Sequence, residues 1–113
     1  MFNGKEVRIL LKGQAKESFL ELKKRGDKEA NSILNSLNRI IDILKDNPQY
    51  GNPIAKNLIP EELKKQGAMN LYRVELSNFW RMLYTLEGNQ VEIFLFILNI
   101  SDHPHYDKLL GYK

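Results

Sequence analysis

The sequence contains no cysteine among its 113 residues. That absence excludes disulfide bonds, thiolate metal sites and a cysteine nucleophile, and it suits a reducing compartment. Long apolar runs are also lacking, because the longest one, residues 93–98, is far shorter than the roughly 20 residues that span a bilayer. Residues 1–13 have neither the apolar stretch nor the small-residue cleavage site of a signal peptide. We therefore expect a cytoplasmic protein without a membrane partner.

Motifs for cofactors and metals are scarce. The chain has no glycine-rich phosphate loop and no nucleophile elbow. It has only two histidines, His103 and His105, and two ligands from one tail do not complete a zinc site. We therefore expect neither a metal nor a small-molecule cofactor.

The sequence also lacks a strong charge of one sign. The net charge is +3, and the basic excess lies in residues 1–70, whereas residues 71–113 are slightly acidic. A small excess of this kind permits a nucleic-acid partner but predicts no broad basic cleft. Hydrophobic residues make up 42% and charged residues 27% of the chain, close to the globular average, so we expect one folded domain over residues 1–113.

The first half of the chain predicts one strand followed by two helices. Residues 7–11 form a short apolar run that is typical of a buried strand. Residues 14–25 are strong helix formers, and residues 30–44 repeat apolar side chains at the three-four spacing of a helix. Gly26 and Asp27 fit a helix C-cap followed by an N-cap, so we expect the two helices to form an αα-hairpin.

The second half predicts strands. Apolar and polar side chains alternate through residues 71–76 and 79–86, and residues 91–100 are almost continuously apolar. Short turns at residues 77–78 and 88–89 favour an antiparallel three-stranded meander. With the first strand and the two helices, this order predicts an α+β domain in which the helices cover one face of a small sheet, followed by a short C-terminal helix or tail.

Two of the five arginines, Arg73 and Arg81, lie on adjacent predicted strands in the most apolar part of the chain. Guanidinium groups bind phosphate in a forked geometry and stay charged at working pH. The pairing register decides whether the two arginines share a face of the sheet. The alternative is structural, with ordinary ion pairs to Glu75 and Glu87.

The segment that follows the last predicted strand holds both histidines of the chain and Tyr106. Histidine titrates near neutral pH, so His103 and His105 are candidates for giving or taking a proton. Functional groups often lie on loops at the ends of rigid strands. The alternative is a polar turn in which Asp102 caps a short helix.

The aromatic residues of the strands could stack on nucleic-acid bases if they were exposed. Most of them occupy inward positions of alternating strands, so we interpret the set as core. These residues are Tyr72, Phe79, Trp80, Tyr84, Phe94 and Phe96.

In order and spacing, nearly the whole chain resembles the RelE/ParE superfamily of bacterial and archaeal toxins. The resemblance lies in the short strand, the helix pair, the glycine- and proline-rich loop, the runs at residues 72–76 and 80–84, and the polar segment that ends at Tyr106. The third strand of that superfamily typically carries an aromatic residue, then arginine, and ends in tyrosine, as Trp80, Arg81 and Tyr84 do here.

The resemblance implies a toxin that is held inactive by a cognate antitoxin protein. RelE-like members are ribosome-dependent endoribonucleases that cut mRNA by metal-independent attack of the 2′-hydroxyl. ParE-like members have the same fold but inhibit DNA gyrase. The resemblance thus leaves an alternative, a non-nuclease gyrase inhibitor or a catalytically weak binding protein of this fold.

By position, the resemblance implies that Arg81 clamps the phosphate and that Arg73 helps to bind it. Tyr106 falls on the C-terminal tyrosine that orients or stacks on the substrate base, and His103 or His105 is then the general base or acid. Many RelE-like members have arginine or lysine in this last segment, so the histidines would represent a variant of the family's proton-transfer chemistry.

Overall fold

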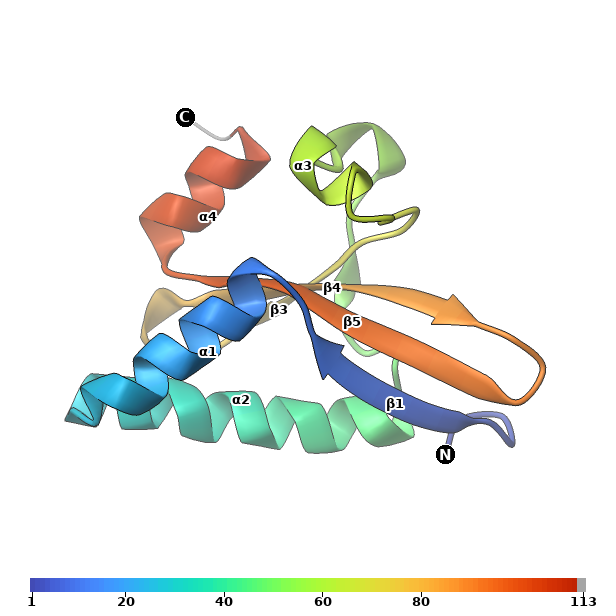
Figure 1. Cartoon of the computed structure of the whole chain (residues 1–113), viewed down its shortest axis with the longest axis horizontal. Helices are drawn as coiled ribbons and strands as arrows, with labels where there is room; N and C mark the ends of the chain where they lie inside the picture. The colour runs from blue at the N-terminus through green and yellow to red at the C-terminus, as the bar shows by residue number, and fades with distance from the viewer. Residues whose placement is uncertain (112–113) are drawn as a thin grey trace.

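A five-stranded mixed sheet separates two groups of helices in the computed structural model of the protein, which describes residues 1–111 (Figure 1). The strand order is β1-β5-β4-β3-β2. The strands are β1 (Glu6–Leu11), β2 (Asn52–Pro53), β3 (Tyr72–Glu75), β4 (Arg81–Gly88) and β5 (Glu92–Ser101). The helices are α1 (Gln14–Arg25), α2 (Lys28–Asp46), α3 (Glu61–Lys64) and α4 (His103–Leu110), with 3-10 turns η1 (Lys56–Leu58) and η2 (Ser77–Phe79).

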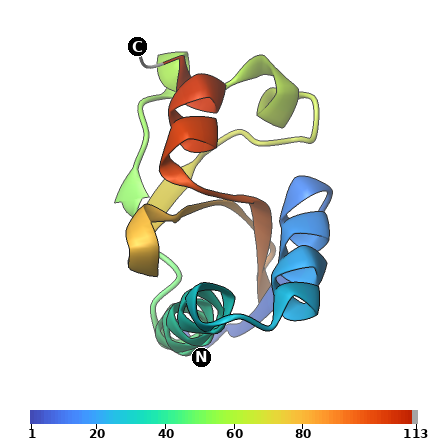
Figure 2. The ribbon, with the colours of Figure 1, turned by 90° about the vertical axis from the view of Figure 1, so that its left-hand side faces the viewer.

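Strand β5 lies inside the sheet and explains why residues 91–100 are so apolar. It pairs in parallel with β1 and antiparallel with β4, and β4 pairs antiparallel with β3. The chain between β1 and β3 contains α1 and α2, which cover one face of the sheet (Figure 2). Buried on both faces, a central strand of this kind favours a continuous apolar run over an alternating one.

Helices α1 and α2 are joined by a two-residue connection, Gly26 and Asp27, that the sequence predicts correctly. Gly26 ends α1 with a left-handed φ of 63°, which glycine adopts without steric cost. Asp27 then caps α2, because its carboxylate accepts a hydrogen bond of 2.7 Å from the backbone N–H of Ala30. In the apolar stripe of α2, Ile33 and Leu37 are fully buried against the sheet.

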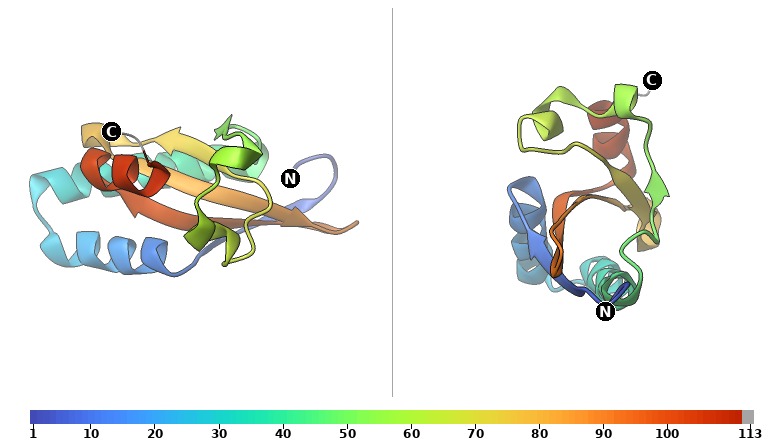
Figure 3. Two further views of the ribbon diagram at one scale, coloured as in Figure 1. Left: turned by 90° about the horizontal axis from the view of Figure 1, so that it is seen from above. Right: turned by 90° about the vertical axis from the view of Figure 1, so that its right-hand side faces the viewer.

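The sheet has a hydrophobic cluster on each face. The alternating side chains of β3 and β4 divide between them, so that Val74 and Met82 join the cluster under α1 and α2, whereas Leu83 joins the opposite cluster. This second cluster also contains Leu63 of α3 and Tyr106 of α4. Seen from above, α4 and the green segment that contains α3 lie over the sheet (Figure 3). The face beneath α4 carries the candidate site.

The predicted α+β class is confirmed, but the sheet differs from the expected one in detail. Strand β2 adds a fifth, edge strand that pairs antiparallel with β3 at only two positions. A strand of two residues, one of them proline, has no alternation that a sequence pattern could reveal, and proline is tolerated only at such an edge. Helices also lie on both faces, because α3 and α4 cover the face opposite α1 and α2. Within residues 1–111, no helix combines the length and the apolar character that crossing a membrane requires.

Candidate functional site

Arg73 and Arg81 project from the same face of the sheet. In the β3–β4 ladder Glu75 pairs with Arg81, and Arg73 pairs with Leu83. Residues that lie directly opposite one another share a face, so the two arginines are diagonal neighbours, two positions out of register. The register that the sequence left open therefore brings the two guanidinium groups to one surface, with the Glu75 carboxylate between them.

The Arg81 side chain is held by three groups. Its Nη1 donates a hydrogen bond of 2.9 Å to the carbonyl oxygen of Phe79. Its Nη2 lies 3.8 Å from the Glu75 carboxylate, and its guanidinium carbon lies 5.4 Å from the centre of the Tyr106 ring. Only 14% of the side chain is exposed. Arg81 therefore forms the ion pair with Glu75 that a structural role predicts. Glu87, the other predicted partner, lies toward the opposite end of β4.

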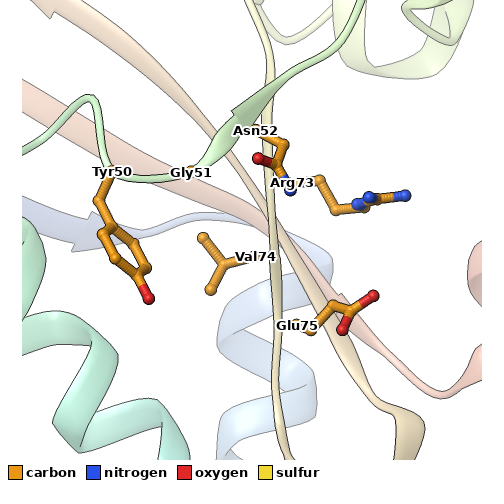
Figure 4. A pocket seen from close by; sticks show the side chains of 6 residues that line it. All are labelled: Tyr50, Gly51, Asn52, Arg73, Val74 and Glu75. Atoms are coloured by element: carbon orange, nitrogen blue, oxygen red, sulfur yellow. The ribbon is translucent and has the colours of Figure 1, made fainter.

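Arg73 lines a cavity of about 400 Å³ beside the short edge strand β2. Figure 4 shows the Arg73 and Glu75 side chains on one side of β3, and Tyr50 and Val74 on the other. Within the described part of the chain the buried Nε of Arg73 has no hydrogen-bond partner. A buried N–H without a partner costs free energy, so the fold leaves part of the hydrogen-bonding capacity of the Arg73 guanidinium unused.

The two histidines lie in the first turn of α4, and each is paired with an aspartate. His103 Nε2 lies 2.9 Å from Asp107, and His105 Nδ1 lies 2.5 Å from Asp102. Both imidazoles are largely exposed, at 53% and 77% of their side-chain surface. Carboxylates placed in this way fix the orientation of an imidazole ring and determine which of its nitrogens faces outward.

His105 lines a second cavity, of about 350 Å³, which connects α4 to the end of β5. The other polar side chains of this cavity are those of Gln14, Glu62, Asn99, Ser101 and Lys108. Ser101 is also the cross-strand partner of Arg81. The structure therefore places the arginine pair on the face of the sheet that His105 also borders. Ser101, opposite Arg81, lines the His105 cavity, whereas Arg73 lines the other one.

Tyr106 lies in the core beneath this face. Only 1% of the residue is exposed, and it packs in the second hydrophobic cluster with Leu83. Its ring faces the Arg81 guanidinium. In this conformation the ring has no free face for a substrate base, so the stacking role that the resemblance implies has no support here. The contact instead gives Tyr106 a part in orienting Arg81.

The turn before β4 holds an aromatic residue that sequence reasoning misplaced. Phe79 is 79% exposed, whereas Tyr84, five residues further on, is completely buried. The interpretation of the aromatic set as core is therefore wrong for Phe79. Its side chain belongs to η2 and not to a strand, so the inward-outward alternation does not apply to it.

The carboxyl groups that cap α2 and α4 are held ionised. Burial alone would raise the pKa of Asp102, but hydrogen bonds from the His105 backbone and imidazole hold this pKa below its usual value of 3.8. The hydrogen bond from the Ala30 backbone, with help from Arg25, lowers the pKa of Asp27 in the same way.

We expect the free energy of unfolding to fall in acid through these two caps. Because their folded pKa values lie below the unfolded ones, the stability they provide is complete above about pH 4 and is lost as the pH falls through the folded values. Asparagine also caps helices but does not titrate, so Asp27→Asn with Asp102→Asn should flatten the decline. Urea unfolding of the wild-type protein and of the double variant, at about pH 6 and about pH 3, measures this decline in the free energy of unfolding. An equal acid decline in both proteins would contradict the assignment.

Within residues 1–111, no group of three or more histidine, aspartate or glutamate side chains is arranged to hold a metal ion.

Comparison with protein-family models, with curated proteins and with solved structures gave no significant match.

Proposed function

We propose that the protein is the toxin of a toxin–antitoxin pair and acts as a ribosome-dependent endoribonuclease that cleaves mRNA. The observation that carries the proposal is the shared face of Arg73 and Arg81, which adjoins the two histidine–aspartate pairs of α4. Cations that bind phosphate and imidazoles that transfer protons are together what phosphodiester cleavage by an internal hydroxyl requires.

The chemistry needs no group beyond the RNA and these side chains. The 2′-hydroxyl oxygen attacks the adjacent phosphorus, and its proton passes to an imidazole. The bond between phosphorus and the 5′-oxygen breaks, and a second acid protonates the leaving oxygen. The products are a 2′,3′-cyclic phosphate and a 5′-hydroxyl end. The arginines stabilise the additional negative charge on the phosphoryl oxygens in the transition state.

The aspartates determine which imidazole nitrogen can take part. Asp102 binds Nδ1 of His105, which leaves Nε2 free to exchange a proton with the substrate. Asp107 binds Nε2 of His103 and leaves Nδ1. His105 is the stronger candidate for contact with substrate, because it lines the cavity that reaches Ser101. Which of the two acts as base and which as acid is assigned by the pH dependence of their single variants.

Replacing both histidines with asparagine is expected to lower mRNA cleavage about 100-fold, the lower range for loss of general acid–base catalysis. His103→Asn with His105→Asn keeps the fold, because both imidazoles are largely exposed. Cleavage of ribosome-bound mRNA by the purified proteins measures the effect, and Lys45→Gln on the exposed side of α2 is the control. Full activity of the double variant would remove the histidines from the mechanism.

The burial of Arg81 favours a second candidate, a non-nuclease of the same fold, either a gyrase inhibitor or a binding protein. Its guanidinium already has three partners within the protein, which a purely structural arginine would also have. In that case expression would arrest growth through DNA damage or not at all, and the histidine variants would behave as wild type. Where expression arrests growth, a small adjacent reading frame of antitoxin size should neutralise the arrest when it is coexpressed.

A further inference from the structure

The turn η2 presents an aromatic ring to solvent at a cost in backbone energy. Asn78 has a φ of 60° and Phe79 a φ of 62°, a left-handed conformation that bulky side chains rarely adopt. The turn is nevertheless held firmly. The Ser77 N–H donates to Ser36 Oγ at 3.1 Å, and the Phe79 carbonyl accepts from Arg81. An exposed ring on a strained but well-anchored turn is the kind of outlier that marks a functional position.

A polar groove of about 380 Å³ lies on the α2 side of the same turn. Its lining contains two cations, three hydroxyl groups and two amides, and no carboxylate. The residues are Lys28, Asn31, Ser32, Asn35, Ser36, Arg39 and Ser77. Because α2 rises about 1.5 Å per residue, Lys28 and Arg39 are about 16 Å apart along it. A chain of phosphates that followed the groove would meet a cation at each end.

We propose that Phe79 and this groove form a subsite for single-stranded nucleic acid, in which a base stacks on Phe79 and the neighbouring backbone phosphates bind Lys28 and Arg39. The inference rests on the proposed function for its substrate class. It places this contact outside the residues that transfer protons. Arg81 binds the Phe79 carbonyl, so the turn that carries this ring is in direct contact with the candidate phosphate clamp.

Two observations favour a nucleic acid over a protein partner at this subsite. Phe79 is the only large hydrophobic side chain exposed between residues 70 and 90, and one isolated ring suits a base better than the apolar patch of a protein interface. The groove is cationic and rich in donors, which matches a phosphate backbone. The adjacent amide of Asn78 is exposed and can bind the edge of a stacked base.

The test measures binding of a fluorescent single-stranded DNA of about 12 nucleotides by anisotropy, within the usual range of such sites. DNA lacks the 2′-hydroxyl and cannot be cleaved by the proposed chemistry, so binding is separated from catalysis. Phe79→Ala should weaken binding between about 5-fold and 100-fold, whereas Phe79→Trp should retain it. Leu20→Ala removes another exposed apolar side chain, on α1, and is the matched control.

Two further variants keep the result independent of folding and of the proposed activity. Phe79→Gly adopts the left-handed turn without strain, so it should keep the melting temperature and still lose affinity. The double variant Lys28→Gln with Arg39→Gln should make the slope of log affinity against log salt concentration shallower by the equivalent of about two phosphate contacts. The control double variant, Lys64→Gln with Lys65→Gln, should leave this slope unchanged.

Unchanged DNA affinity in Phe79→Ala and Phe79→Gly would overturn the subsite. It would also be overturned if these variants bound DNA normally and lost affinity only for a protein partner. If wild-type protein binds the DNA through Phe79 yet cleaves no mRNA, the proposed nuclease activity fails and the subsite stands.

Discussion

Replacing Arg81 with glutamine is expected to reduce cleavage of ribosome-bound mRNA at least about 100-fold and to relieve growth arrest on expression. Loss of a preorganised donor to a developing oxyanion costs rates of this order. Glutamine keeps a polar side chain at this position, but it is shorter and lacks both the charge and the fork of the guanidinium that faces Tyr106. A cleavage time course with purified protein, accompanied by a melting curve, measures the change.

The Arg81 result needs two comparisons, because this side chain is mostly buried and ion-paired with Glu75. Arg8→Gln is the control for the loss of an ion-paired strand arginine, since Arg8 lies on β1 and pairs with Glu6 and Glu92. Glu75→Gln tests the structural explanation. If Arg81 serves only to pair with Glu75, the Glu75 and Arg81 variants should lose stability alike and neither should alter cleavage.

Replacing Tyr84 with phenylalanine is expected to lower the free energy of unfolding by about 2–4 kcal/mol, because two buried backbone groups lose their partner. The Tyr84 hydroxyl donates to the Pro48 carbonyl at 2.7 Å and accepts from the Gly51 N–H at 2.9 Å. Burial raises the pKa of this hydroxyl to about 12, so it stays protonated and can fill both roles. Urea denaturation at neutral pH measures the loss.

Tyr72→Phe is the control for the Tyr84 experiment. The two rings stack at 5.1 Å between their centres, but Tyr72 is only half-buried. Loss of its hydroxyl should cost less than about 1 kcal/mol. Equal losses of unfolding free energy in the two variants would contradict this prediction. They would show that the hydrogen bonds to Pro48 and Gly51 stabilise the fold no more than the hydrogen bonds that the same groups make to water in the unfolded chain.

The Tyr84 bridge also connects stability to the candidate site. It fixes the segment between α2 and β2, and Asn52 of β2 pairs with Arg73. Gly51 has no room for a side chain, because a Cβ there would lie 2.9 Å from the Tyr84 ring. Tyr84 of β4, one of the residues behind the resemblance, thus has a structural role in this chain: it holds the edge of the sheet beside Arg73.

Sequence patterns predict the faces of β3 and β4 well and their register poorly. The alternation correctly separates Val74 and Met82 from Arg73 and Leu83, because the two faces bury different clusters. The register depends on the turn between the strands, and η2 contains two left-handed residues that no turn motif announces. The same turn explains why Phe79 could not be predicted as exposed.

The C-terminal segment illustrates the same limit. Asp102 before a run of helix-compatible residues predicts a capped helix, and α4 begins directly after it. Its histidine–aspartate pairs follow from helical spacing once the helix is known. The burial of Tyr106 depends on how α4 packs over the sheet, a tertiary contact that local sequence does not encode.

We propose that the face formed by Arg73, Arg81 and α4 cleaves mRNA on the ribosome. The most direct test incubates purified protein with programmed ribosomes and identifies the chemistry of the new RNA ends. We expect cleavage that requires the ribosome, leaves 2′,3′-cyclic phosphate and 5′-hydroxyl ends, and is lost in Arg81→Gln but not in Arg8→Gln. Intact mRNA at stoichiometric protein, or ends that carry a 5′-phosphate, would contradict it.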